Sequence, residues 1–330
     1  MTDPVQERYA RFARDEAPGR SALYAEWATG VAGDEELRAV LRRVPETHRQ
    51  PPLVFAVARL LGAPLAGYRE FRSFVLTNAE AVVAECAARS LQTNEPLRLA
   101  ALLPVLSEID GPLALLELGA SAGLCLYPDR YSYRYTGEDG RVRRALDPED
   151  GPSAVVLHSR VTGELPALRM PRVVWRAGID LAPLDAADDA DRRWLRGLVW
   201  PGEAGRERRV EAALDIAAAD PPLLVAGDAG ERVEELAARA PADATLVITT
   251  PGVLVHIPRA ARSALVARIR SLPARWVTID PPGLLDGWAP PVEAATWPGF
   301  VVALDGRVRA AADPLGRWWE WRTGDQPEPS

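Results

Sequence analysis

The sequence predicts an α/β protein in which a mostly parallel sheet of seven strands follows a helical amino-terminal region. Residues 1–110 carry apolar side chains at helical spacing and contain no alternating strand pattern. From residue 111 onward, short apolar segments alternate with helical ones, which is typical of parallel strands joined by helices. Several of these apolar segments end in an acidic or hydroxyl residue, and ligands of parallel sheets bind at such strand ends.

The composition indicates a globular protein whose main partner is not a polyanion. The chain has 330 residues, of which 48% are hydrophobic and 26% charged, and its formal net charge is −7. This acidic balance argues against nucleic acid or an anionic membrane as a partner. No apolar run approaches the ~20 residues of a membrane span, and the first residues lack the features of a signal peptide. We therefore expect a cytoplasmic protein with a small-molecule substrate; the sequence leaves its oligomeric state open.

Cysteine and histidine are too few and too dispersed to indicate a metal centre. The two cysteines are Cys86 and Cys125, and the three histidines are His48, His158 and His256. Neither a disulfide framework nor a cysteine- or histidine-rich metal site fits this distribution. We expect no metal ion in the functional site.

Residues 1–110 are predicted to form a helical cap domain. Asp34 is placed to cap the helix that follows it, and Pro51 and Pro52 are typical of the first helical turn. The apolar spacing predicts helices at Pro4–Glu16, Ser21–Ala28, Glu35–Val44, Leu53–Leu61, Tyr68–Leu76, Asn78–Leu91 and Pro96–Ile109.

Residues 111–322 are predicted to form the sheet domain, and residues 323–330 a disordered tail. The Asp305–Gly306 pair suits a hairpin turn between short strands. Strands are predicted at Leu113–Leu116, Arg172–Asp180, Pro222–Gly227, Ala244–Thr250, Arg275–Asp280, Gly299–Leu304 and Arg317–Trp321, and helices at Asp188–Trp200, Arg206–Ala219, Glu231–Arg239 and Arg259–Ser271.

A small β insertion is predicted at about residues 127–171. Tyr131, Tyr133 and Tyr135 alternate with polar residues, and Val155–Arg160 is a second short strand candidate. The insertion accounts for the distance between the first strand and the second strand of the main sheet. In nucleotide-binding folds an acidic residue usually follows the glycine turn by only ~20 residues.

The stretch Glu117-Leu-Gly-Ala-Ser-Ala-Gly123 follows a strand and precedes apolar residues at helical spacing. Glycines at such a turn let the backbone approach a ligand and direct its N–H groups toward it. E-x-G-x-x-x-G is the first motif of Rossmann-like S-adenosylmethionine (SAM) methyltransferases. The same residues match G-x-S-x-G, the nucleophile elbow of α/β-hydrolases. A glycine-rich turn without a ligand is the third interpretation.

The order of elements favours the methyltransferase interpretation. The elbow serine of a hydrolase normally follows several strands of the sheet, whereas Ser121 follows a helical region. The ends of the predicted strands then supply a cofactor site at one edge of a Rossmann-like sheet. Its predicted members are Glu117, Gly119, Ala120, Ser121, Gly123, Asp180, Asp228, Ala229 and Thr249.

Other polar and aromatic residues are candidates for catalysis and substrate binding. His256 follows the fourth strand of the main sheet and is a candidate general base. Asn94 and Glu95 precede the first strand and are expected to approach the cofactor site; their alternative role is an ordinary helix start. Tyr131, Arg176 and Thr250 are candidate substrate contacts, although aromatic side chains on strands are often part of the core.

Five short motifs of the chain resemble a bacterial family, domain of unknown function 2332. The motifs are Gln92-Thr-Asn-Glu95, Glu117-x-Gly-Ala-Ser-Ala-Gly123, Asp129-Arg-Tyr-x-Tyr133, Arg176-x-Gly-Ile-Asp-x-x-Pro183 and Trp200-Pro201. The likeness runs from about residue 5 to residue 322, and it implies a fold similar to SAM-dependent methyltransferases. Two histidines of the family pattern are absent, because Thr250-Pro251 and Pro314-Leu315-Gly316 stand in their places.

The function expected from the sequence is SAM-dependent methyl transfer to a small molecule. One alternative is a serine hydrolase in which Ser121, Asp228 and His256 occur in the hydrolase order. The other is a SAM-binding protein without catalysis, which the two missing family histidines make reasonable.

Overall fold

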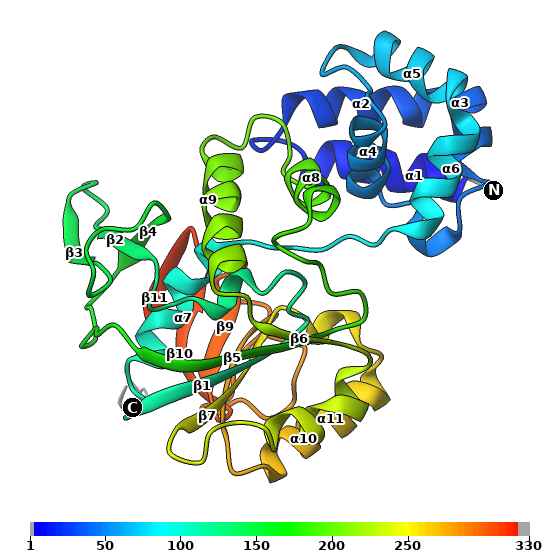
Figure 1. Cartoon of the computed structure of the whole chain (residues 1–330). Helices are drawn as coiled ribbons and strands as arrows, with labels where there is room; N and C mark the ends of the chain where they lie inside the picture. Colours follow the sequence, from blue (N-terminus) through cyan, green and yellow to red (C-terminus); the bar gives the residue numbers. More distant parts are fainter. Residues whose placement is uncertain (1–2, 323–330) are drawn as a thin grey trace. The chain divides into compact units, whose positions relative to one another are not determined.

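The computed structural model of the chain describes residues 3–322 (Figure 1). The protein is of the α/β class, with α-helices and one mixed sheet of eleven strands in this range. It divides into two compact units. The first contains the chain up to Thr93 together with Asp188–Glu211, and the second contains the remainder. This division differs from the predicted boundary after residue 110, and the predicted tail lies outside the described residues.

The first unit is helical, as predicted. Its core includes a stacked pair of aromatic rings, Trp27 and Phe71, whose centroids are 4.3 Å apart. Asp3, Ser21 and Asp34 accept hydrogen bonds from first-turn N–H groups, which is the expected role of such residues at helix starts. The helices are α1 (Pro4–Arg11), α2 (Ala22–Gly33), α3 (Glu35–Leu41), α4 (Pro51–Leu60), α5 (Tyr68–Thr77), α6 (Ala79–Ala88) and α8 (Asp189–Gly197).

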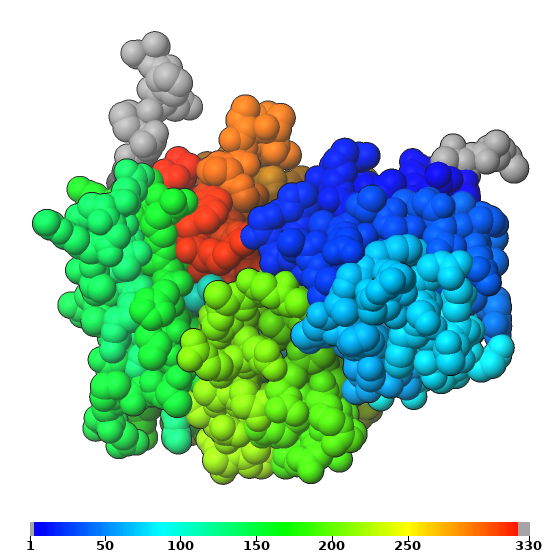
Figure 2. All heavy atoms as spheres, turned by 90° about the horizontal axis from the view of Figure 1, so that it is seen from above, coloured from blue at the N-terminus to red at the C-terminus, as the bar shows by residue number. Residues whose placement is uncertain are grey.

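The second unit contains the sheet, in the order β3-β2-β4-β11-β10-β9-β8-β7-β1-β5-β6. The strands are β1 (Pro112–Leu118), β2 (Ser132–Thr136), β3 (Val142–Leu146), β4 (Val156–Thr162), β5 (Arg172–Asp180), β6 (Leu223–Ala226), β7 (Thr245–Pro251), β8 (Arg275–Asp280), β9 (Phe300–Leu304), β10 (Arg307–Ala312) and β11 (Trp318–Trp321). The predicted number of seven strands is therefore too low, because β10 was missed and the insertion joins the same sheet. In Figure 2 the insertion (green) lies directly beside the carboxy-terminal strands (red), in agreement with the parallel pairing of β4 with β11.

Five neighbouring strands, β6-β5-β1-β7-β8, are parallel to one another. Strand β9 is antiparallel to β8, and β10 is antiparallel to β9. The chain first adds β5 and β6 on one side of β1 and then adds β7 and β8 on its other side. The order in which strands are added therefore changes direction at β1. In open α/β sheets, ligands bind at such a switch point.

Apolar side chains of the parallel strands pack against helices α10 (Ala229–Ala237) and α11 (Arg259–Ser271). Leu116 and Leu118 of β1 belong to this core. Because side chains alternate along a strand, Glu117 points to the opposite face of the sheet. Helix α7 (Leu99–Leu106), whose residues are all buried, packs against β4, β8, β9 and β10.

The chain after β1 differs from the expected strand–turn–helix unit. A single turn of 3₁₀ helix, Leu124–Leu126, follows Gly123, and the chain then continues toward β2. Pro128 disfavours the helical conformation for the residue before it, which explains why no longer helix forms here. The turn therefore lacks the helix N-terminus that commonly binds anions in this position.

Candidate functional site

The predicted strand ends meet at one edge of the sheet. Glu117 of β1 lies opposite Gly178 of β5 on one side and opposite Thr249 of β7 on the other. Asp180 is the last residue of β5, two positions beyond Gly178. Gly119 and Asp180 therefore lie at the tips of neighbouring strands, with Thr249 at the level of Glu117.

The turn from Gly119 to Gly123 is held by Asp180 and Asn94. The two carboxylate oxygens of Asp180 accept hydrogen bonds from the backbone N–H groups of Ser121 (2.8 Å) and Ala182 (2.9 Å). Asn94 is buried; its Nδ2 donates to Ser121 Oγ, and its Oδ1 accepts from Ala122 N at 3.3 Å. Ser121 has a φ of +51°, a strained conformation for a residue with a side chain. These contacts stabilise the turn in that conformation.

Gly119 is packed against the segment that follows β7. Its φ is +75°, and a Cβ at this position would lie 2.5 Å from Cγ2 of Val253. The requirement for glycine is thus explained by the backbone conformation and by Val253, without a ligand. A ligand at this point of the crevice requires Val253 to move.

Replacing Gly119 by alanine should destabilise the protein by about 2–6 kcal/mol, since backbone strain and overpacking each cost about 1–3 kcal/mol. Urea unfolding of Gly119→Ala measures this loss. In the Val253→Ala background, Gly119→Ala should no longer cause the loss of stability that comes from the clash with Val253. The loss that comes from the positive φ should remain. Strictly additive effects of the two substitutions would contradict the contact.

Glu117 is a buried acid with one unsatisfied oxygen. The residue is 3% exposed, and Oε2 has no hydrogen-bond partner among the described residues. Burial raises the pKa of Glu117 to about 8; the positive charge of Arg98 opposes this shift and the negative charge of Asp180 adds to it. The carboxyl group is therefore largely protonated at neutral pH. Strongly shifted acids of this kind are common in functional sites.

Arg98 was missed by the sequence analysis and lies near several of these groups. Its Nε donates to Pro314 O (3.0 Å) and its Nη1 to Pro251 O (2.7 Å), which joins the segment after β10 to the last residue of β7. Its remaining nitrogen, Nη2, donates to no described residue, and Arg98 forms no direct ion pair with Glu117. The sequence signal was an isolated cation immediately before the wholly apolar helix α7.

Asp280 was missed as well. It is the last residue of β8, fully buried, and its Oδ2 accepts a hydrogen bond from Thr278. Burial raises its pKa to about 7; the hydrogen bond from Thr278 and the charges of Arg98 and Arg262 oppose the shift. The signal was present, because β8 ends in an acid as β5 does.

The predicted substrate contacts have structural partners. The hydroxyl of Tyr131 donates to Leu124 O (2.8 Å), and Tyr131 is fully buried. Arg176 pairs with Asp129 (2.8 Å) and lies over the ring of Tyr127. The structure thus places both residues in the packing of the turn and the insertion.

The remaining predicted residues lie at the same edge in different environments. The pKa of His256 is lowered, because its ring is partly withdrawn from water and the positive charge of Arg98 lies nearby. Asp228 is exposed and caps α10, which begins at Ala229, through Gly230 N (2.7 Å). Glu95 is buried and accepts a hydrogen bond from Leu97 N (3.0 Å). Thr250 is fully buried and donates to Thr278 Oγ1 (2.8 Å).

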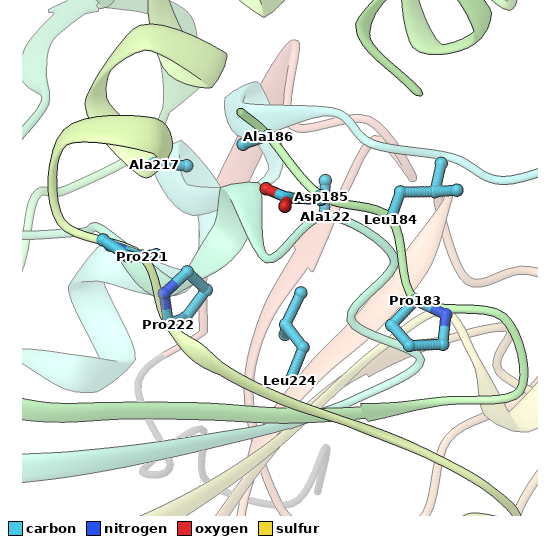
Figure 3. Close-up of a pocket in the computed structure, with 9 residues that line it drawn as sticks. All are labelled: Ala122, Pro183, Leu184, Asp185, Ala186, Ala217, Pro221, Pro222 and Leu224. Atoms are coloured by element: carbon cyan, nitrogen blue, oxygen red, sulfur yellow. The ribbon is translucent and has the colours of Figure 1, made fainter. Parts of the chain in front are cut away.

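A pocket of about 290 Å³ adjoins the turn that contains Ser121. Its lining side chains are apolar apart from Asp185, whose carboxylate Figure 3 shows directed between them. The lining residues are Ala122, Pro183, Leu184, Asp185, Ala186, Ala217, Pro221, Pro222 and Leu224.

Residues 3–322 contain neither a metal-binding cluster nor a membrane-spanning helix. No group of three or more His, Cys, Asp or Glu side chains in this part of the chain is arranged to hold a metal ion. None of the helices described is both long and apolar enough to cross a membrane.

Comparison with known proteins identifies a family over nearly the whole chain. The sequence profile of the family described as "Uncharacterized protein conserved in bacteria (DUF2332)" matches residues 6–321. Neither a curated protein nor a solved structure matches the chain.

Proposed function

Because the chain belongs to the DUF2332 family, whose description names no activity, we propose from the site itself that it binds SAM and transfers the methyl group to a small molecule. The observation that carries this proposal is the position of Glu117 and Gly119 at the switch point of the parallel strands. In chain order these strands run 3-2-1-4-5, as in doubly wound nucleotide-binding sheets.

The amino-acid end of SAM matches one buried unsatisfied oxygen and one half-buried cation. An α-ammonium group donates hydrogen bonds, and Glu117 Oε2 accepts none from the described residues. An α-carboxylate accepts hydrogen bonds, and Nη2 of the half-buried Arg98 donates none to those residues. Because the two side chains form no direct ion pair, a zwitterionic group between them would satisfy both.

The adenosine end is assigned to the tip of β5. Each oxygen of Asp180 accepts one backbone N–H and retains a lone pair for a ribose hydroxyl. The next residue, Leu181, is 78% exposed and offers an apolar surface to a purine ring. The segment that carries Val253 must shift to admit a ligand to the crevice beside Gly119.

SAM, when bound, supplies an electrophilic methyl group on a sulfonium. The residues of this chain would then contribute by binding, orientation and exclusion of water, which together account for much of the acceleration of a two-substrate reaction. In this proposal Glu117 and Arg98 fix the amino-acid end, Asp180 fixes the ribose, and Asn94 holds the turn beneath them.

The hydrolase interpretation has less support. The positive φ of Ser121 is consistent with a strained elbow, but the turn leads into three residues of 3₁₀ helix instead of the helix of an elbow. A serine-directed fluorophosphonate that labels the wild type, but not Ser121→Ala, would reverse this preference.

Methyl transfer is tested with SAM labelled in its methyl group and the small-molecule fraction of a bacterial extract. The wild type should transfer the labelled methyl group to at least one small molecule of the extract. In Glu117→Gln, which keeps the shape of the side chain but cannot take the ionised form that would pair with the α-ammonium group, transfer should fall about 10- to 100-fold, because a hydrogen bond to a charged group contributes about 1.5–3 kcal/mol. Glu138→Gln, on the exposed β2–β3 hairpin, is the control. SAM binding without transfer would instead indicate a protein that binds SAM without catalysis.

A further inference from the structure

A chain of hydrogen bonds at the ends of β7 and β8 points toward one acid. Thr250 lies opposite Thr278 in the pairing of the two strands. The indole N–H of Trp276 donates to Thr250 Oγ1 (3.0 Å), Thr250 Oγ1 donates to Thr278 Oγ1 (2.8 Å), and Thr278 donates to Asp280 Oδ2. The Thr278 hydroxyl also lies 3.3 Å from Thr250 O, so its single proton is donated either to that carbonyl or to Asp280 Oδ2; in the second case the chain of donors ends on this one oxygen of Asp280.

The second oxygen of Asp280 is left without a partner. Asp280 Oδ1 is buried and has no hydrogen bond in the part of the chain that the structure describes. A buried polar atom in this state costs about 1–3 kcal/mol and is rare in native proteins. Asp180, at the tip of β5, uses both of its oxygens to bind backbone N–H groups. One oxygen of Asp280 is thus held by the protein, and the other is left for a ligand.

Asp280 lies at the carboxyl edge of the sheet on the face of Trp276 and helices α10 and α11, opposite to the face of Glu117, so a pair of substrates that contacts both acids has to lie beyond the strand ends. Strand β8 is two positions from β1, with β7 between them, so neighbouring-strand spacing of about 4.8 Å puts the ends of β1 and β8 about 10 Å apart in the direction across the sheet. A ligand held at β5 and β1 would therefore leave the ends of β7 and β8 for the molecule that reacts with it.

We propose that Asp280 Oδ1 binds the methyl acceptor, that the acceptor is an amine in its ammonium form, and that Asp280 removes the proton that blocks its nitrogen. This inference rests on the proposed function. An ammonium nitrogen has no lone pair, so it gives one proton to Asp280 Oδ1. The lone pair released then forms the N–C bond while the S–C bond of SAM breaks and leaves its electron pair on sulfur.

The surrounding charges are compatible with this role. The cations that act on Asp280 are Arg98, before α7, and Arg262 of α11. They favour the ionised form, whereas burial favours the protonated form and raises the pKa to about 7. A base with a pKa near the working pH transfers protons most effectively. Since Asp280 is fully buried, the acceptor can reach it only if a neighbouring segment shifts. The neighbours in the sheet are Pro251 of β7, which pairs with Ile279, and Val301 of β9, which pairs with Asp280 itself.

The first test uses binding, without turnover. In protein with ¹³C-labelled aspartate carboxyl groups, the Asp280 resonance is assigned by its loss in Asp280→Asn. We expect it to titrate with a midpoint near pH 7 and to shift when benzylamine is added in the presence of S-adenosylhomocysteine. Benzyl alcohol, a neutral analogue, should cause no comparable shift. If the chemical shift of the Asp280 resonance does not change on addition of benzylamine, the proposal is overturned, whether or not SAM binds.

The second test uses transfer to primary amines in a labelled-SAM assay. Asp280→Asn should bind SAM within about threefold of the wild-type affinity and lose about 100-fold or more in kcat, an effect of the size of general-base catalysis. Thr278→Val keeps the acid but removes its orienting donor, and should shift the pH profile of kcat. Asp243→Asn, exposed on the amino-terminal side of β7, is the matched control. Full activity of Asp280→Asn would contradict the proposal, whereas absence of SAM binding by the wild type would contradict the proposed function alone.

Discussion

Raising the pH from 5 to 8 should destabilise the wild-type protein relative to Glu117→Gln. The folded protein holds the Glu117 proton up to a pKa of about 8, whereas the ordinary value for the unfolded chain is 4.5. Between these two values the folded state binds more protons than the unfolded state. The free energy of unfolding therefore falls as the pH rises through this window, and it levels off above the folded pKa.

The expected slope is at most about 1.4 kcal/mol per pH unit for this one group. Glutamine has the same shape and no proton to lose, so its stability relative to the wild type should increase steadily over the window. Urea unfolding of both proteins at four pH values measures the difference, with exposed Glu138→Gln as the control. Parallel stability curves for the wild type and Glu117→Gln would show that Glu117 is not protonated in the folded protein. The stability of Asp280→Asn relative to the wild type should likewise increase with pH, from the ordinary pKa of 3.8 up to the folded-state pKa of about 7.

Replacing Arg98 by methionine should weaken the binding of S-adenosylhomocysteine about 10- to 100-fold. The proposed contact is a hydrogen bond between charged groups, which contributes about 1.5–3 kcal/mol, and each 1.4 kcal/mol corresponds to a factor of ten in affinity. The substitution also removes the donors of Pro251 O and Pro314 O, so the stability of the variant has to be measured alongside.

Arg309→Met is the matched control, because Arg309 pairs with Glu108 through Nε at 3.0 Å and is distant in sequence from every strand end assigned to the ligand. Isothermal titration of the folded variants gives the affinities. Arg98→Lys keeps the positive charge but not the planar guanidinium group. Its affinity for S-adenosylhomocysteine should lie between those of the wild type and Arg98→Met. An Arg98→Met variant that binds as tightly as the wild type would exclude Arg98 from the ligand site.

The helices of the first unit and the main strands were predictable because their apolar periodicity is regular. The same rule placed Glu117, Asp180 and Thr249 together, since the carboxyl ends of parallel strands lie at one edge. Applied consistently, it would also have identified Asp280 at the end of β8. Arg98 was harder to recognise, because its role depends on backbone carbonyls more than 150 residues away in the chain.

Two features of the fold depended on long-range pairing that a local pattern does not contain. Residues of the predicted insertion form strands that add to the main sheet through β4 and β11, and this contact joins segments far apart in sequence. The expected helix after Gly123 is absent, because Pro128 and the tyrosines that follow direct the chain into β2. The packing of Val253 on Gly119 was likewise invisible in the sequence, although it decides whether the crevice is open.

Calorimetric titration of the purified protein with SAM decides whether the end of β1 binds this cofactor. We expect saturable binding at one site, competition by S-adenosylhomocysteine, and an equal or higher affinity in Val253→Ala, where the side chain over Gly119 is shortened. Absence of binding in both the wild type and Val253→Ala would contradict the proposed SAM site.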